Sequence, residues 1–123
     1  MKAGLLVFLG GGAGSVLRYA VGRLLAVFQP AFPLGTLVSN FSSCLIFGLV
    51  LAVVSARANL GDPVKLFFLT GVCGGFSTYS AFTYETAGLL KNGLNGLALA
   101  NIFLNLFLSL GGLYLGSALG KFF

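Results

Sequence analysis

The chain has 123 residues, of which 58% are hydrophobic and 7% are charged, and its formal net charge is +5 at pH 7. A soluble domain of this length needs much more charge on its surface, so the composition excludes a soluble fold and predicts an all-α membrane protein. The basic residues are scattered along the chain without forming a patch, which excludes nucleic acid as a partner. Histidine is absent from the sequence, and no nucleophile–base pair or metal-ligand cluster is evident, so we do not expect an enzyme.

Apolar runs of about 20 residues, the length that crosses a bilayer, recur four times. We place these spans near residues 3–27, 34–56, 64–90 and 94–120, separated by short segments rich in Pro, Gly, Asn or charge. Residues 1–123 are therefore predicted to form a single transmembrane domain. The basic residues show only a weak excess on the side of the termini, which predicts cytoplasmic termini but leaves insertion in both orientations open.

The first span contains a run of small residues at 10–14, followed by Arg18. Small residues spaced four apart, here at 12–16 and again at 112–116, let helices approach closely. Packing inside one subunit explains this spacing about as well as packing between subunits, and the small size of the chain tips the balance toward a homodimer. If both orientations insert, the two subunits are antiparallel. Arg18 has to snorkel, form an ion pair or line a water-filled vestibule, where its charge would attract anions.

The second span carries Asn40 among apolar residues. Its amide can donate two hydrogen bonds, which suits an anion that is losing its water. The alternative is a hydrogen bond between packed helices. We favour the first interpretation and assign Asn40 to a pore.

The third span is interrupted at residues 71–82 by adjacent glycines, hydroxyl side chains and two aromatic rings. A backbone that leaves the helix inside lipid must be satisfied by protein, water or an ion, so a break here indicates a permeation pathway. Tyr79 and Phe82 are three residues apart and share a helix face. Their positive ring edges can contact an anion without holding it as firmly as an ammonium group would.

The break also offers backbone oxygens. With Gly74 and Gly75 relaxing the helix, the carbonyls of Gly74 and Ser77 can turn outward, and those of two subunits together suit a hard cation such as sodium. Glu85 follows the break, and we expect it to lie near a helix end or to pair with a basic residue.

The fourth span has polar residues every four positions, which places them in one stripe on a helix face. Such a stripe either lines an ion pathway or seals a seam between helices, and the two functions are compatible. We assign the second and third members of the stripe to the pore. The members are Asn101, Asn105 and Ser109.

Three segments, residues 10–19, 35–40 and 70–82, resemble the Fluc (CrcB) family of fluoride ion channels. The resemblance covers essentially the whole chain and includes the expected number of helices. It implies an antiparallel, dual-topology homodimer with two pores, which exports cytoplasmic fluoride passively across the inner (plasma) membrane. It also implies a structural sodium ion at the dimer centre, held by the carbonyls of Gly74 and Ser77.

The same resemblance gives Asn40, Tyr79, Phe82 and Ser109 to the fluoride pathway and Arg18 to the vestibule. The chain departs from the family pattern at three positions. Tyr79 replaces the usual phenylalanine, and hydroxyls that are common elsewhere are missing at Ala81 and Leu113.

Two other function classes stay open at this point. A proton-coupled exporter of the small four-helix multidrug type needs a carboxylate in its binding cavity, and here Glu85 would have to supply it. A non-conducting membrane scaffold would tolerate loss of Asn40.

Overall fold

The computed structural model describes residues 1–28, 31–57 and 61–123, and every regular element in these ranges is helical. The chain begins with α1 (Lys2–Ala26) and α2 (Leu34–Ala56). A composite segment follows, made of α3 (Asp62–Val64), the π-helix η1 (Lys65–Cys73) and α4 (Gly74–Phe76). After a short break come α5 (Tyr79–Lys91) and α6 (Asn95–Gly120). The expected loops fall partly on residues 29–30 and 58–60, which lie outside the described residues.

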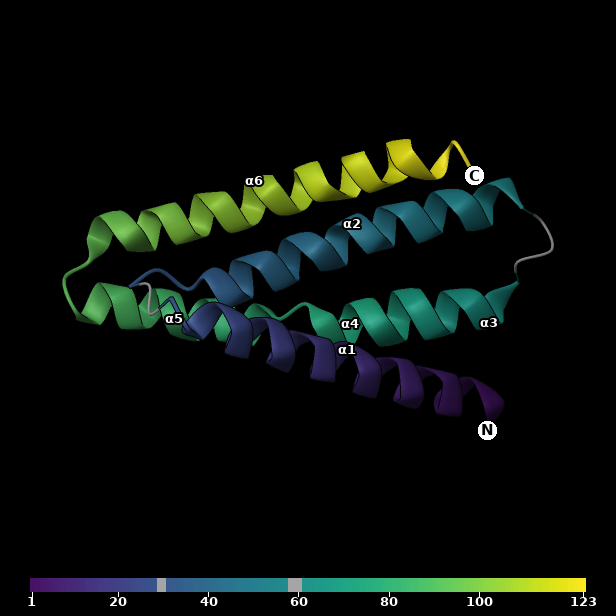
Figure 1. Cartoon of the computed structure of the whole chain (residues 1–123), viewed down its shortest axis with the longest axis horizontal. Helices are drawn as coiled ribbons and strands as arrows, with labels where there is room; N and C mark the ends of the chain where they lie inside the picture. Colours follow the sequence, from purple (N-terminus) through teal and green to yellow (C-terminus); the bar gives the residue numbers. More distant parts are fainter. Residues whose placement is uncertain (29–30, 58–60) are drawn as a thin grey trace.

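The helices lie alongside one another in alternating directions. Figure 1 shows α1 and the segment from α3 to α5 running one way, α2 and α6 running the other way, and both termini at the same end. Within the described residues, α1, α2 and α6 are long and apolar enough to cross a membrane. The prediction of an all-α membrane protein is therefore confirmed. The span predicted near 64–90, with a break, consists of two helical pieces.

The break in this segment is confirmed within the predicted range 71–82, but the backbone does not open at Gly74 and Gly75 as expected. Gly74 keeps helical backbone angles, whereas Ser77 and Thr78 are extended, with ψ of 158° and 118°. The helix therefore opens at hydroxyl residues, whose side chains can replace lost backbone hydrogen bonds.

The glycines before the break have a packing function instead. A Cβ added at Gly75 would meet the backbone nitrogen of Ser15 at 3.0 Å, and one added at Gly71 would meet the Cα of Gly10 at 2.9 Å. Glycine is thus required where the η1–α4 segment approaches α1 most closely.

A second set of glycines brings α6 against α2. A Cβ at Gly112 would meet the carbonyl oxygen of Phe41 at 2.9 Å, and one at Gly116 would meet the nitrogen of Leu49 at the same distance. By contrast, nothing lies within 4 Å of a Cβ at Gly12 or Gly111. Packing inside one subunit therefore accounts for the spacing at 112–116, whereas Gly12 makes no close contact with the described residues of its own subunit.

Candidate functional site

A cavity of about 400 Å³ lies between α2, α5 and α6, and we call it the aromatic cavity. Every residue predicted for the pore lines it, although these residues come from helices far apart in the sequence. Apolar side chains and a thiol complete the wall. The lining residues are Asn40, Cys44, Tyr79, Phe82, Ile102, Asn105, Leu106, Ser109, Leu110 and Leu113.

The two aromatic rings of the cavity are neighbours on the first turn of α5. The ring centroids of Tyr79 and Phe82 are 5.6 Å apart and the ring planes are inclined by 50°. The prediction that they share a face is confirmed. Tyr79 is 79% exposed, so the cavity is open on the side of this ring.

Asn40 connects the cavity wall to the break. Its Oδ1 accepts a hydrogen bond from the backbone nitrogen of Thr78 at 2.8 Å, and its Nδ2 donates to Oδ1 of Asn105 at 2.9 Å. Nδ2 also makes a long contact of 3.4 Å with the carbonyl oxygen of Thr78. Asn40 therefore lines the cavity and also forms the interhelical hydrogen bond, and its assignment to a pore stays a prediction.

Hydroxyl side chains form further hydrogen bonds on both sides of the break. Oγ1 of Thr78 accepts from the nitrogen of Ala81 at 3.2 Å and caps the start of α5. The hydroxyls of Ser43 and Ser77 both donate to the carbonyl oxygen of Cys73 at 2.9 Å. The break is thus a built feature of the fold, supported from α2 as well as from its own residues.

This arrangement releases two carbonyls from helical bonding. In a continuous helix Gly74 and Ser77 would accept from the nitrogens of Thr78 and Ala81, which instead donate to Asn40 and to the Thr78 hydroxyl. Gly74 and Ser77 also line a second cavity, of about 330 Å³, which we call the carbonyl cavity. Neutral carbonyl oxygens are ligands that suit a hard cation, so these residues fit the predicted sodium site.

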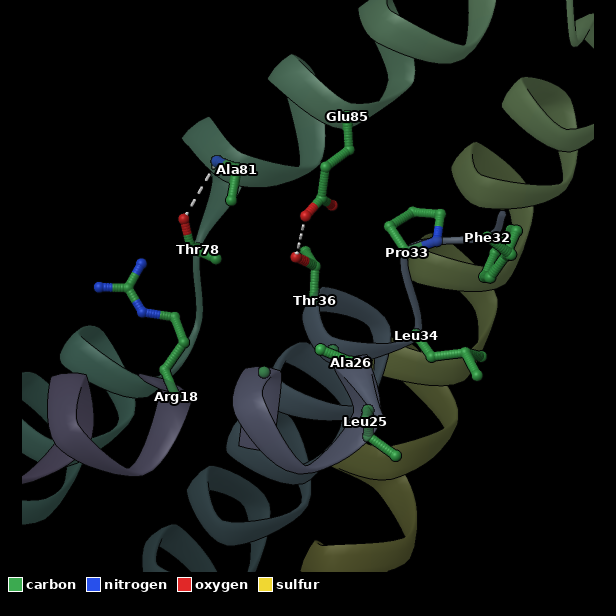
Figure 2. A pocket seen from close by; sticks show the side chains of 12 residues that line it. Arg18, Leu25, Ala26, Phe32, Pro33, Leu34, Thr36, Thr78, Ala81 and Glu85 are labelled. Atoms are coloured by element: carbon green, nitrogen blue, oxygen red, sulfur yellow. Dashed lines mark hydrogen bonds between the residues drawn. The ribbon is translucent and has the colours of Figure 1, made fainter. Parts of the chain in front are cut away.

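Arg18 and Glu85 line a third cavity, of about 300 Å³, near the start of α2. Oε1 of Glu85 accepts from Oγ1 of Thr36 at 2.7 Å. Figure 2 shows this hydrogen bond and the Thr78 cap in one view, and the guanidinium of Arg18 points away from the carboxylate of Glu85. The expectation for Glu85 was wrong: it lies within α5 rather than at its end, and its partner is a hydroxyl rather than a base.

The polar stripe of α6 divides into two parts. Ser109 and Asn105 line the aromatic cavity, whereas Asn101 is fully buried and donates from Nδ2 to Oγ1 of Thr86 at 2.9 Å. The stripe is a cavity wall at one end and a seam between α5 and α6 at the other. Sequence reasoning did not single out Thr86, although its spacing of four from Phe82 placed it on the same helix face.

Known proteins resemble this chain over nearly its whole length. Residues 5–117 match the CrcB-like protein family, also described as Camphor Resistance (CrcB). A protein of Nitrobacter hamburgensis named fluoride-specific ion channel FluC 2 is 40% identical over 116 residues, which cover 94% of each chain. The fluoride-specific ion channel FluC of Serratia proteamaculans is 44% identical over 83% of this chain and 80% of its own. The protein of the same name from Pyrococcus horikoshii is 35% identical over 94% of each. The chain belongs to the CrcB-like protein family.

Proposed function

We propose that this chain is a subunit of a fluoride-selective channel in the inner (plasma) membrane, and not an enzyme. The observation that carries the proposal is the aromatic cavity, which places an amide, a hydroxyl and two rings beside a break in a membrane helix. Relatives that share this length of sequence are named fluoride-specific ion channels.

The cavity offers a small anion weak partners in succession. Asn40 and Ser109 supply N–H and O–H donors, and the rings of Tyr79 and Phe82 supply positive edges. Such neutral groups replace water around the ion and still release it, which conduction requires. Arg18 lines a separate cavity near the break, where its charge raises the local concentration of anions.

The complete channel is a pair of antiparallel subunits, each with four membrane spans, and the pair has two pores. Support comes from the common end of both termini in Figure 1 and from the weak charge bias, which permits insertion both ways up. It also comes from Tyr79, whose ring is largely exposed although it belongs to the cavity. A second copy would close that side.

Gly74 and Ser77 would hold a structural sodium ion through their released carbonyls, together with the same residues of a second copy. A bound sodium supplies positive charge that keeps the oxygens of the two breaks together.

Replacement of sodium by N-methylglucamine during purification is therefore expected to lower the thermal stability of the dimer. An ion that binds only the assembled state contributes on the order of 3 kcal/mol at a hundredfold excess over its Kd. The measurement is the midpoint of thermal dissociation by size-exclusion chromatography, with sodium restored as the control. An unchanged midpoint would argue against the ion.

Export is the direction expected in microbes. Neutral hydrogen fluoride crosses the bilayer, dissociates in the less acidic cytoplasm, and leaves the anion trapped until a channel releases it.

The competing proposal is a proton-coupled exporter, because Glu85 lines a cavity and its Oε2 is buried without a partner among the described residues. Fluoride efflux from reconstituted vesicles without a pH gradient, with chloride as the control ion, separates the two. We expect rapid fluoride efflux from the parent chain, no comparable chloride efflux, and persistence of fluoride efflux in Glu85→Gln, whose amide oxygen still accepts from Thr36. Loss of all transport in this variant, or dependence on a proton gradient, would support the exporter.

A further inference from the structure

A chain of hydrogen bonds leaves the aromatic cavity and returns to the helix that carries its rings. It starts at the backbone nitrogen of Thr78 and passes through side chains of α2 and α6. It ends at the carbonyl oxygen of Phe82, and its contacts are 2.8–3.0 Å long. The side chains in order are Asn40, Asn105, Asn101 and Thr86.

The donor-to-acceptor direction of this series of hydrogen bonds is fixed from both of its ends. The Thr78 nitrogen can only donate, so Asn40 must turn Oδ1 toward it and Nδ2 toward Asn105. At the other end the carbonyl of Phe82 can only accept, so the hydroxyl of Thr86 donates to it at 2.8 Å.

Thr86 has one hydroxyl hydrogen, so its oxygen must accept from Nδ2 of Asn101, at 2.9 Å. Asn101 then presents Oδ1 to Asn105. The two ends impose the same orientation on every amide between them.

This orientation decides which N–H groups are left for an anion. Nδ2 of Asn105 donates to both the carbonyl oxygen and Oδ1 of Asn101, at 3.0 and 2.8 Å, so both its hydrogens have partners. Nδ2 of Asn40 uses one hydrogen on Asn105, and the other makes only the long 3.4 Å contact with Thr78. Asn40 is thus the amide of the cavity with a donor to offer.

We infer that Asn101 and Thr86, which do not line the aromatic cavity, are positioning residues for fluoride conduction. They hold the Asn105 amide in one orientation, and Asn105 in turn holds Asn40 with an N–H available to the ion. The inference rests on the proposed function. It changes the role of Asn105, which lines the cavity but acts on the ion through Asn40.

The test compares Thr86→Val, which keeps the shape of the side chain and removes its hydroxyl, with Thr86→Ser, which keeps the hydroxyl. Two quantities are measured in reconstituted vesicles: fluoride efflux, and hydrogen–deuterium exchange at the backbone amide of Thr78. Without the Thr86 acceptor, Nδ2 of Asn101 loses its partner, and the orientations of Asn105 and Asn40 are then fixed from the Thr78 end alone. We expect Thr86→Val to slow efflux about fivefold and to speed exchange at Thr78 about fivefold, the size of one weakened buried hydrogen bond. Thr86→Ser is expected to match the parent chain within about twofold.

General loosening of the fold is recognised by the exchange of α1, which has no member in the hydrogen-bond chain. Equal acceleration in α1 and at Thr78 would overturn the inference, and so would parental efflux or parental Thr78 exchange in Thr86→Val. If the parent chain itself conducts no fluoride, the proposed function fails. If the parent conducts and Thr86→Val matches it, only the positioning role fails.

Discussion

Replacement of Phe82 by isoleucine is expected to slow fluoride efflux by about a hundredfold, the cost of removing one group aimed at a buried negative charge. Isoleucine keeps much of the volume but has no ring, so the positive edge that faces the anion is lost. The ring of Tyr79, 5.6 Å away, remains on the same face and does not replace it, because the two rings lie almost one helical turn apart on α5. Efflux from vesicles is the measurement, and size-exclusion chromatography checks that assembly persists.

The matched control for this variant is Phe8→Ile. Phe8 is 75% exposed on α1 and lines none of the three cavities described above. The same change of side chain there is expected to leave efflux unaltered. If Phe82→Ile conducts as fast as the parent chain, Phe82 is not on the pathway and the aromatic cavity is not the pore.

The helices that cross the structure without interruption follow from local sequence. The apolar runs placed near 34–56 and 94–120 correspond to α2 (Leu34–Ala56) and α6 (Asn95–Gly120). Their length and composition determine them without reference to any neighbour. The exact position of the break was harder to predict from the sequence, because a glycine can indicate either a flexible backbone or a close contact between helices. Gly75 turned out to serve the contact, and the helix opens at Ser77 and Thr78 instead.

The membership of the site was also predictable, but its hydrogen bonds were not. Asn40 and Asn105 could be selected because an amide inside a membrane helix is costly and therefore informative. The partner of each amide depends on helices that meet only in the folded chain. Thr36 and Glu85, for example, are 49 residues apart in sequence and 2.7 Å apart in space. Spacing alone therefore could not show which donors remain for the ion.

Loss of the Asn40 amide is expected to have the largest effect on conduction, with efflux in Asn40→Ala slower by a factor on the order of 10²–10³. Two consequences combine in this variant. The cavity loses its N–H donor for the anion, and the backbone nitrogen of Thr78 and Oδ1 of Asn105 lose their partner. An unsatisfied buried group of this kind costs about 1–3 kcal/mol, which weakens the support of the break just before the aromatic rings.

Ser42→Ala is the control for this variant, because Ser42 lies two residues away on α2 and lines none of the three cavities. We expect this control to conduct at the parental rate. The comparison of these two variants distinguishes a channel from a membrane scaffold. If the family assignment reflected only a structural function, Asn40→Ala and Ser42→Ala would be tolerated equally and neither would change ion flux. A selective collapse of fluoride efflux in Asn40→Ala, with assembly intact, would show that conduction depends on the amide beside the break.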